Sequence, residues 1–180
     1  MLWDGPSESI HRLPRDAVPQ KNVHDLLLLS RGMIEEIGMN PKTVRDLMSE
    51  EPVTLGVGAN LAEAHDIMET RHVRHIPIID DDGSVVGLIT ERDLLRAAGP
   101  AINELPVDAR NQVLAQTPVV DVMIHDPECV TPDADLTSAA QTLLDNKFGC
   151  LPVVGDINGV SGILTESDFV RLFAEGIVES

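Results

Sequence analysis

Apolar residues recur at the spacing of an amphipathic helix in two separate stretches of the chain. The first stretch contains Leu61, Ala64, Ile67 and Met68, and the second contains Leu136, Ala139, Ala140, Leu143 and Leu144. Asn60 and Asp135 precede these stretches and are good N-cap residues, because their side chains accept hydrogen bonds from the first N–H groups of a helix. Glu63 stands at the position of a capping-box partner for Asn60. The pattern predicts two helices that begin directly after residues 60 and 135.

Short apolar runs bounded by turn-forming residues predict strands on both sides of each helix. In the first half these are a brief strand at Val53–Leu55 and two strands, Ile76–Ile79 and Val85–Ile89, around the turn Asp80–Gly83. Glu128–Val130 is the corresponding brief strand of the second half. A further helix is expected to begin at Glu91 and another at Glu166. Each half is therefore predicted to be a β-α-β-β-α unit.

The two halves are copies of one unit. An offset of 75 residues aligns Val44–Asp93 with Val119–Asp168 without a gap, and 14 of the 50 aligned positions are identical. The closest local match is between Gly-Leu-Ile-Thr-Glu-Arg-Asp, beginning at Gly87, and Gly-Ile-Leu-Thr-Glu-Ser-Asp, beginning at Gly162. A chance match would not keep one register over this length, so the chain contains an internal duplication.

The remaining residues form an N-terminal extension and a linker. The repeats are expected at 41–98 and 119–175, with an extension over 1–40 and a linker over 99–118. Residues 1–21 contain three prolines and no apolar period, so this segment is expected to be extended or flexible. Residues 22–38 are expected to form a helix with an apolar face. The linker contains a further helical stretch between its prolines.

The net charge of the chain limits the classes of molecule that the protein is expected to bind. The chain has 30 acidic and 13 basic residues, a formal net charge of −17, which repels nucleic acid and anionic membranes. The apolar run Leu26–Leu29 is too short to span a membrane, so a cytoplasmic protein is expected. Cys129 and Cys150 do not have the spacing of a metal site and are expected to be free thiols.

Two motifs, each present in both repeats, resemble those of a known family. They are an aliphatic-Pro-aliphatic strand, at Ile76–Ile78 and Leu151–Val153, and Gly-x-x-Thr-x-x-Asp, ending at Asp93 and Asp168. Both motifs, in this order and at one offset, resemble a tandem pair of CBS (cystathionine-β-synthase) domains, the arrangement called a Bateman module. The resemblance implies an α/β (α+β) fold of two β-α-β-β-α repeats packed with pseudo-two-fold symmetry, here with an N-terminal helical extension.

The Thr-x-x-Asp motif has two interpretations. Thr before a helix, with an acidic residue three positions later, is also a capping box, although that box favours Glu or Gln over Asp. A short carboxylate on the first turn is well suited to accept hydrogen bonds from a ribose diol, and the Thr hydroxyl and helix N-terminus can donate to phosphate. The resemblance implies that Asp holds the ribose and that Thr reaches toward phosphate.

The resemblance also implies two binding sites, each shared between the repeats. Site one comprises Arg74, His75, Ile89, Thr90 and Asp93, lined by Val130, Ala134 and Phe148. Site two comprises Leu164, Thr165 and Asp168, lined by Leu55, Ala59 and Val73. In the family, basic residues just before the proline strand contact phosphate, a pattern that Arg74 and His75 match. Gly149 and Cys150 stand at these positions in the second repeat, so site two departs from the phosphate-binding pattern.

The resemblance therefore implies a non-catalytic regulatory module that binds an adenosine-containing ligand (AMP, ADP, ATP or similar) in the cleft between the repeats. It also implies a homodimer with a downstream protein partner and no required cofactor. One alternative is a structural or dimerisation module that binds other proteins and leaves its pockets empty. Another is an enzyme whose site lies between residues 1–40 and the repeats. His65, His72 and His75 share one region, but without a carboxylate at ligand spacing no metal site is expected.

Overall fold

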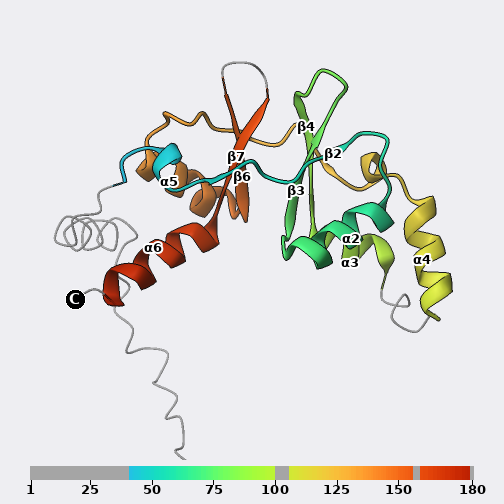
Figure 1. Ribbon diagram of the computed structural model, residues 1–180. Coiled ribbons are helices and arrows are strands. Elements are labelled where there is room, and N and C mark those ends of the chain that lie inside the picture. Colours follow the sequence, from blue (N-terminus) through green and yellow to red (C-terminus); the bar gives the residue numbers. More distant parts are fainter. Residues whose placement is uncertain (1–40, 100–105, 156–158, 179–180) are drawn as a thin grey trace, which may run out of the picture. The chain divides into compact units, whose positions relative to one another are not determined.

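The computed structural model describes residues 41–99, 106–155 and 159–178 (Figure 1). The predicted flexible segment 1–21 and the predicted helix 22–38 lie outside the described residues. Within the described part, the predicted hairpin of the first repeat and the predicted helices of both repeats are present, together with short elements that the sequence does not predict. The brief strand predicted at Val53–Leu55 is β2 at Leu55–Gly56, and the one predicted at Glu128–Val130 is reduced to a single bridge residue, Val130, because the neighbouring residues do not pair.

The two repeats have the same order of elements, except that the second has only a bridge residue, Val130, where the first has the strand β2. The elements of the first repeat are a 3₁₀ helix η2 (Val44–Asp46), β1 (Ser49–Glu50), β2 (Leu55–Gly56), α2 (Leu61–Arg71), β3 (His75–Ile79), β4 (Val85–Thr90) and α3 (Glu91–Ala98). The linker and second repeat form α4 (Val107–Gln116), η4 (Val119–Asp121), β5 (Ile124–His125), α5 (Leu136–Asn146), β6 (Cys150–Val154), β7 (Val160–Thr165) and α6 (Glu166–Val178). The mixed α+β class is confirmed, and α4 confirms the helical stretch predicted in the linker.

The predicted helix starts are confirmed by their hydrogen bonds. The side chain of Asn60 accepts from the N–H groups of Ala62 and Glu63, and the Glu63 carboxylate accepts from the Asn60 N–H at 2.9 Å. The side chain of Asp135 accepts from the Ser138 N–H at 2.8 Å. These bonds satisfy donors that the first turn of a helix leaves without a partner, which explains why α2 and α5 begin where they do.

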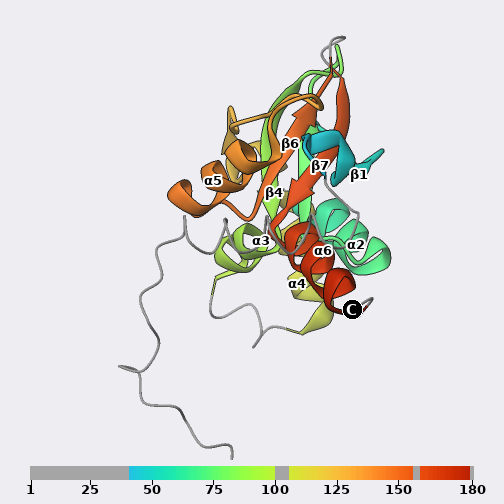
Figure 2. The same ribbon diagram turned by 90° about the vertical axis from the view of Figure 1, so that its left-hand side faces the viewer.

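Each repeat contributes a hairpin to a separate sheet. In one sheet the strand order is β2-β3-β4-β5, and Ile76 on β3 lies opposite Ile89 on β4. In the other sheet the order is β1-β7-β6, and Leu151 on β6 lies opposite Leu164 on β7. Val130 adds a parallel bridge to Val153, at the position that β2 occupies in the first sheet. Figure 1 shows the two hairpins, and Figure 2 shows α5 and α6 beside β6 and β7.

The two repeats exchange their first segments. β5 belongs to the second repeat but pairs with β4 of the first, with Ile124 opposite Leu88. β1 belongs to the first repeat but pairs with β7 of the second, with Ser49 opposite Ile163. Each sheet is therefore completed by a strand from the other repeat.

Apolar burial and backbone hydrogen bonds anchor the exchanged segments. Val44 is fully buried in the core cluster of the second repeat, and its N–H donates to the carbonyl of Ala134 at 3.0 Å. Val119 is fully buried in the cluster of the first repeat, and its N–H donates to the carbonyl of Ala59 at 2.9 Å. Burying one valine side chain contributes about 1.5–3 kcal/mol, so this pair of contacts stabilises the exchange substantially.

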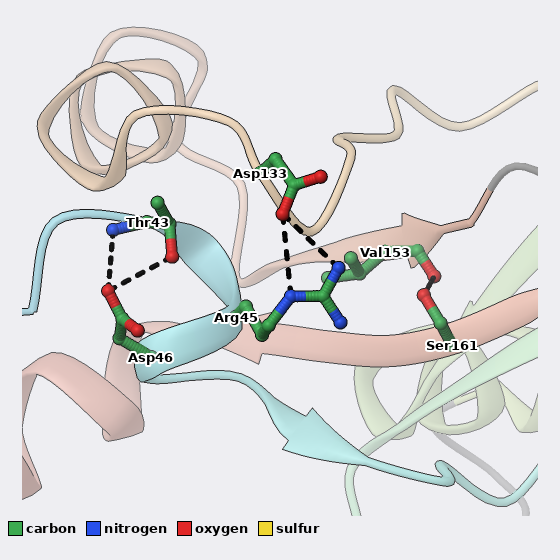
Figure 3. A network of polar contacts seen from close by, with 6 residues as sticks. All are labelled: Thr43, Arg45, Asp46, Asp133, Val153 and Ser161. Carbon is green, nitrogen blue, oxygen red and sulfur yellow. Dashed lines mark hydrogen bonds and ion pairs between the residues drawn. The ribbon is translucent and has the colours of Figure 1, made fainter.

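A polar network accompanies the exchange on the surface (Figure 3). The guanidinium of Arg45, on η2, lies 3.2 Å from the carboxylate of Asp133 in the second repeat. Both side chains are more than half exposed, and exposed ion pairs contribute about 0–1 kcal/mol. Burial of Val44 and Val119 therefore outweighs this ion pair in holding the repeats together.

A third buried cluster lies where the two hairpins meet. It consists of Leu88 on β4, Cys150 on β6 and Ile163 on β7. Leu88 and Ile163 are equivalent residues of the two repeats, separated by the offset of 75. The cluster therefore agrees with the predicted pseudo-two-fold packing, since equivalent side chains meet each other.

Candidate functional site

The Thr-x-x-Asp motif lies at the strand-to-helix junction of each repeat. In the first repeat the Thr90 hydroxyl donates to Asp93 Oδ2 at 2.6 Å, and the Thr90 N–H donates to the same oxygen at 3.1 Å. In the second, the corresponding distances from Thr165 to Asp168 Oδ2 are 2.8 and 2.7 Å. Asp93 is 7% exposed and Asp168 is 2% exposed. The duplication thus places a buried carboxylate at the start of α3 and of α6.

The capping-box interpretation of the motif is confirmed for the first repeat. The Asp93 N–H donates to the Thr90 hydroxyl oxygen at 3.2 Å while the Asp93 carboxylate accepts from Thr90, which closes the box in both directions. Asp therefore serves at a position for which Glu and Gln are the usual residues. A hydroxyl has a single hydrogen, and Thr90 gives it to Asp93 in this structure. For Thr90 to donate to a phosphate, this hydrogen bond would have to break.

The second carboxylate oxygen of each motif faces an arginine that the sequence analysis overlooked. Arg96 lies 3.4 Å from Asp93 Oδ1, and Arg171 lies 3.3 Å from Asp168 Oδ1. Both arginine side chains are more than half exposed, so the pairs are open to solvent on one side. The offset of 75 also relates Arg96 to Arg171, and this repetition was the signal that could have revealed them. A ribose diol binding at Oδ1 would compete with these arginines.

Arg74 of site one is exposed and lines a groove of about 370 Å³. The Glu91 N–H donates to the carbonyl of Arg74 at 3.0 Å, which fixes the Arg74 backbone beside the first turn of α3. The groove is formed by α2, α3 and the segment between α2 and β3, and it is lined by His65, Met68, Glu69, His72, Val73, Arg74, Glu91, Leu94 and Leu95. Val73, predicted as a lining residue of site two, lies in the same groove.

His75 of site one reaches the second repeat. A Cβ atom on residue 149 would lie only 2.7 Å from His75 Nε2, so the imidazole occupies the space beside Gly149. Burial lowers the pKa of His75 below its usual range, and the neighbouring guanidinium of Arg74 lowers it further. The carboxylates of Glu166 and Asp93 act in the opposite direction, more weakly than burial. The balance of these effects favours the neutral form of the His75 imidazole.

The predicted apolar lining residues pack within their own repeats. Ile89 of site one lies in the core cluster that Leu55, Ala59 and Val73 pack against. Leu164 of site two lies in the cluster that Val130, Ala134 and Phe148 pack against. The family resemblance implied the opposite arrangement, in which each group of three residues lines the site of the other repeat. All six residues are partly buried, and the predicted exchange of lining residues between sites stays a prediction.

Other candidate chemistry is limited in the part of the chain that the structure describes. Its residues include no group of three or more His, Cys, Asp or Glu side chains that could hold a metal ion. Burial raises the pKa of the Cys150 thiol to about 12, and Cys129 is also a free thiol with a raised pKa. Among the described helices, none has the length and apolar character needed to cross a lipid bilayer.

Comparison with known proteins establishes the family. The family model for the CBS domain matches the chain twice, over residues 44–99 and 119–175. Each match covers one of the two repeats. The chain therefore belongs to the CBS-domain family, and its two domains form a tandem pair.

Relatives carry this pair within longer chains. Protein MJ1225 of Methanocaldococcus jannaschii is 35% identical over 129 residues, which cover 72% of this chain and 42% of that protein. Homoserine O-acetyltransferase of Methanohalophilus mahii is 30% identical over 156 residues, which cover 85% of this chain and 29% of that enzyme. The chain thus spans less than half the length of these relatives.

Solved CBS pairs have the same fold. The CBS domain pair of protein MJ0100, in complex with 5-methylthioadenosine and S-adenosyl-L-methionine, has a TM-score of 0.63 and 26% identity, covering 75% of this chain and 98% of that one. CBSX2 of Arabidopsis thaliana, in complex with AMP, has a TM-score of 0.61 and 28% identity, with the same two coverages. These two solved pairs are thus described with adenosine compounds that differ in their 5′ substituents.

Proposed function

We propose that this CBS pair is a regulatory module that binds an adenosine-containing ligand at the Thr-x-x-Asp motifs of its two repeats. AMP, ADP and ATP are the first candidates for site one, because Arg74 supplies a cation close to the first turn of α3. The module transmits ligand binding to a partner protein or to a second copy of itself. Its role is regulatory rather than catalytic.

The observation that carries this proposal is the pair of buried carboxylates. A buried carboxylate is costly to keep charged unless it has strong hydrogen-bond partners. Asp93 Oδ2 is held by Thr90, whereas among the described residues its Oδ1 has only a long contact, with the exposed Arg96. The same arrangement recurs at Asp168 and Arg171. An acceptor oxygen held in one orientation at the edge of the fold is suited to a ribose diol.

The solved relatives support the choice of adenosine compounds. The MJ0100 pair is described with methylthioadenosine and S-adenosylmethionine, and CBSX2 is described with AMP. These three ligands share adenosine and differ at the 5′ position. Their shared part agrees with a ribose-binding Asp, which is present in both repeats of this chain.

One observation favours the alternative of a structural module with empty pockets. The Thr90–Asp93 capping box is closed in both directions by groups of the protein itself. A capping residue typically contributes about 0.5–2 kcal/mol to stability, which is reason enough for a protein to retain such a motif. The two functions therefore differ in whether Asp93 contributes to ligand binding as well as to folding.

Isothermal titration calorimetry on the full chain tests the proposal. AMP, ATP, adenosine, 5′-methylthioadenosine and S-adenosylmethionine are titrated into the wild type and the Asp93→Ala and Asp168→Ala variants. Asp46→Ala is a matched control, because Asp46 closes a similar Thr-x-x-Asp box with Thr43 on the surface. The proposal is supported if the wild type binds one of these compounds saturably and if Asp93→Ala or Asp168→Ala weakens this binding. The Asp46→Ala control should leave the affinity unchanged. Absence of binding by all five compounds at millimolar concentration would leave the structural module as the function.

The family resemblance also leads us to propose a homodimer located in the cytoplasm. Sedimentation of the full chain at micromolar concentration should then give about twice the protomer mass of 19.5 kDa.

A further inference from the structure

The groove between α2 and α3 of the first repeat, the α2–α3 groove, is lined in part by apolar side chains. Met68 and Leu94 are buried and Val73 is partly buried, whereas Leu95 is 62% exposed. The groove has a volume of about 370 Å³. A cavity of about 150 Å³ is sufficient to bind benzene, so the α2–α3 groove has room for the ring of a phenylalanine.

The second repeat has larger apolar side chains at two of the equivalent positions. By the offset of 75, Phe148 corresponds to Val73 and Phe169 corresponds to Leu94. Both phenylalanines are partly buried and pack against the core cluster of the second repeat. The space of the α2–α3 groove in the first repeat therefore corresponds to two aromatic rings in the second.

Helix α6 of the second repeat exposes apolar side chains. Val170 and Phe173 are three residues apart, so they are neighbours on one face of the helix, the α6 face. They are 68% and 51% exposed. The first repeat has Ala98 at the position equivalent to Phe173, so this ring is a feature of the second repeat alone. Neighbouring exposed apolar side chains of this size indicate a surface that contacts another molecule.

The charges on the two surfaces permit them to approach each other. The chain has a net charge of −17, so two copies repel each other unless the facing surfaces carry little charge of one sign. Glu166 is the charged residue of the α6 face, which continues with Ala174. The α2–α3 groove combines Arg74, which is opposite in sign to Glu166, with Glu69 and Glu91. Neither surface therefore has a strong field of one sign.

We propose that the α2–α3 groove of one copy receives Val170 and Phe173 of a second copy, so that the first repeat of each chain packs against the second repeat of the other. This inference rests on the proposed homodimer and extends it by naming the two surfaces that meet. A two-fold axis makes both contacts at once and closes the assembly as a dimer. If like repeats met instead, Phe173 would lie against Phe173, and the two grooves would face each other without a side chain to fill them.

Sedimentation equilibrium on the full chain measures the dissociation constant of the dimer. Phe173→Ala should raise this constant about ten- to a hundred-fold, because an aromatic ring that fills a pocket of its partner dominates the binding energy. Val73→Phe should act in the same direction from the other surface, because it fills the groove with the side chain that the second repeat has at the equivalent position. Val113→Ala should leave the constant unchanged, because Val113 is an exposed apolar residue of α4 outside both surfaces.

Cross-linking identifies which repeats meet. In a Cys129→Ser background, Glu69→Cys places an exposed thiol at the groove, and Ala174→Cys places one beside Phe173. After the two variants are mixed and their subunits exchange, a short bismaleimide should join them into covalent dimers. Each variant alone should give no covalent dimer. Efficient cross-linking of either variant with itself would show that like repeats meet.

The outcomes that overturn the inference are distinguishable from failure of the proposed homodimer. If the wild type is a dimer but Phe173→Ala and Val73→Phe leave its dissociation constant unchanged, the interface lies elsewhere and only the inference fails. The same holds if like repeats cross-link. A wild type that stays monomeric at micromolar concentration removes the homodimer and the inference together. Adenosine binding is measured separately by calorimetry, so the proposed ligand-binding function does not depend on these results.

Discussion

Met123 of the second repeat lies directly against Gly87 of the first, and its sulfur occupies the space that a Cβ atom on residue 87 would need. The equivalent pair, Met48 and Gly162, has the same relationship, with the Met48 sulfur 2.5 Å from the position of a Cβ atom. Gly87 and Gly162 are the first residues of the two matching heptapeptides. These glycines allow the exchanged segments to pack against the hairpins.

Gly87→Ala should therefore destabilise the fold. Overpacking a buried position typically costs about 1–3 kcal/mol, and Met123 is 8% exposed, with little room to move away. Urea unfolding followed by circular dichroism measures the loss. Gly58→Ala is the matched control, because a Cβ atom at Gly58 would have no neighbour within 4 Å. Equal free energies of unfolding for the two variants would show that the Met123 side chain moves aside without loss of stability.

Asp93→Ala should weaken the binding of any adenosine ligand to site one. A charge-assisted hydrogen bond contributes about 1.5–3 kcal/mol, so the affinity should fall about ten- to a hundred-fold. Calorimetry with AMP measures this change, and the Asp46→Ala variant controls for the loss of a capping box. Unchanged AMP affinity in Asp93→Ala, together with strong loss in Asp168→Ala, would place the nucleotide in site two.

Arg74→Ala should separate phosphate from adenosine. The variant is expected to bind AMP or ATP more weakly and adenosine with nearly unchanged affinity, because only the phosphate loses a partner. The effect should be larger at low salt, where the field of a chain with net charge −17 is least screened. Arg71→Ala removes the same charge from the last turn of α2, outside the lining of the groove, and serves as the control. A parallel loss of AMP and adenosine binding in Arg74→Ala would contradict this role.

The lowered pKa of His75 predicts a pH dependence of stability. Because the pKa is lower in the folded state than in the unfolded chain, the unfolded state binds a proton first as the pH falls. The free energy of unfolding of the wild type should decrease as the pH falls below about 6.5, the pKa of His75 in the unfolded chain. This decrease should end once the pH is below the lower pKa that His75 has in the folded protein. Urea midpoints measured between pH 8 and pH 5 for the wild type and His75→Gln test this. An identical pH dependence of the two proteins would exclude His75 as its source.

The two thiols should differ in reactivity. Burial raises the pKa of Cys150 to about 12, so about one thiol in ten thousand is ionised at pH 8. Cys129 is partly exposed, and its thiol donates to the carbonyl of Pro127 at 3.3 Å. A thiol reagent should therefore modify one residue per native chain and both after unfolding. If the Cys129→Ser variant no longer reacts in its folded state, the modified thiol is that of Cys129. Rapid modification of Cys150 in the folded variant would contradict the burial of its side chain.

The hydrophobic pattern and the offset of 75 were sufficient to predict the long elements. α2 and α5 begin after Asn60 and Asp135 as expected, because N-cap chemistry is local and can be read from a few adjacent residues. The β3–β4 hairpin was predictable for a similar reason, since its strands are apolar and separated by a turn.

The exchange of first segments could not be predicted from the pattern. β1 and β5 are two residues long, and all four of their residues are exposed, so they have no apolar period. Their pairing depends on partners on the other repeat, far away in the sequence. The position of the His75 ring also depends on a distant residue, because the ring occupies the space beside Gly149. The residues next to His75 in the sequence do not indicate this contact.

The exchanged segments give the chain the organisation of a domain-swapped dimer whose two protomers have been joined end to end. A single repeat, expressed by itself, would lack the valine that completes its own core and would present an open sheet edge instead. Separated halves are therefore fragments that complement each other, and the covalent connection through α4 makes their association intramolecular. That connection replaces a concentration-dependent encounter with a fixed, high effective concentration, so the fold tolerates dilution that would dissociate two separate halves.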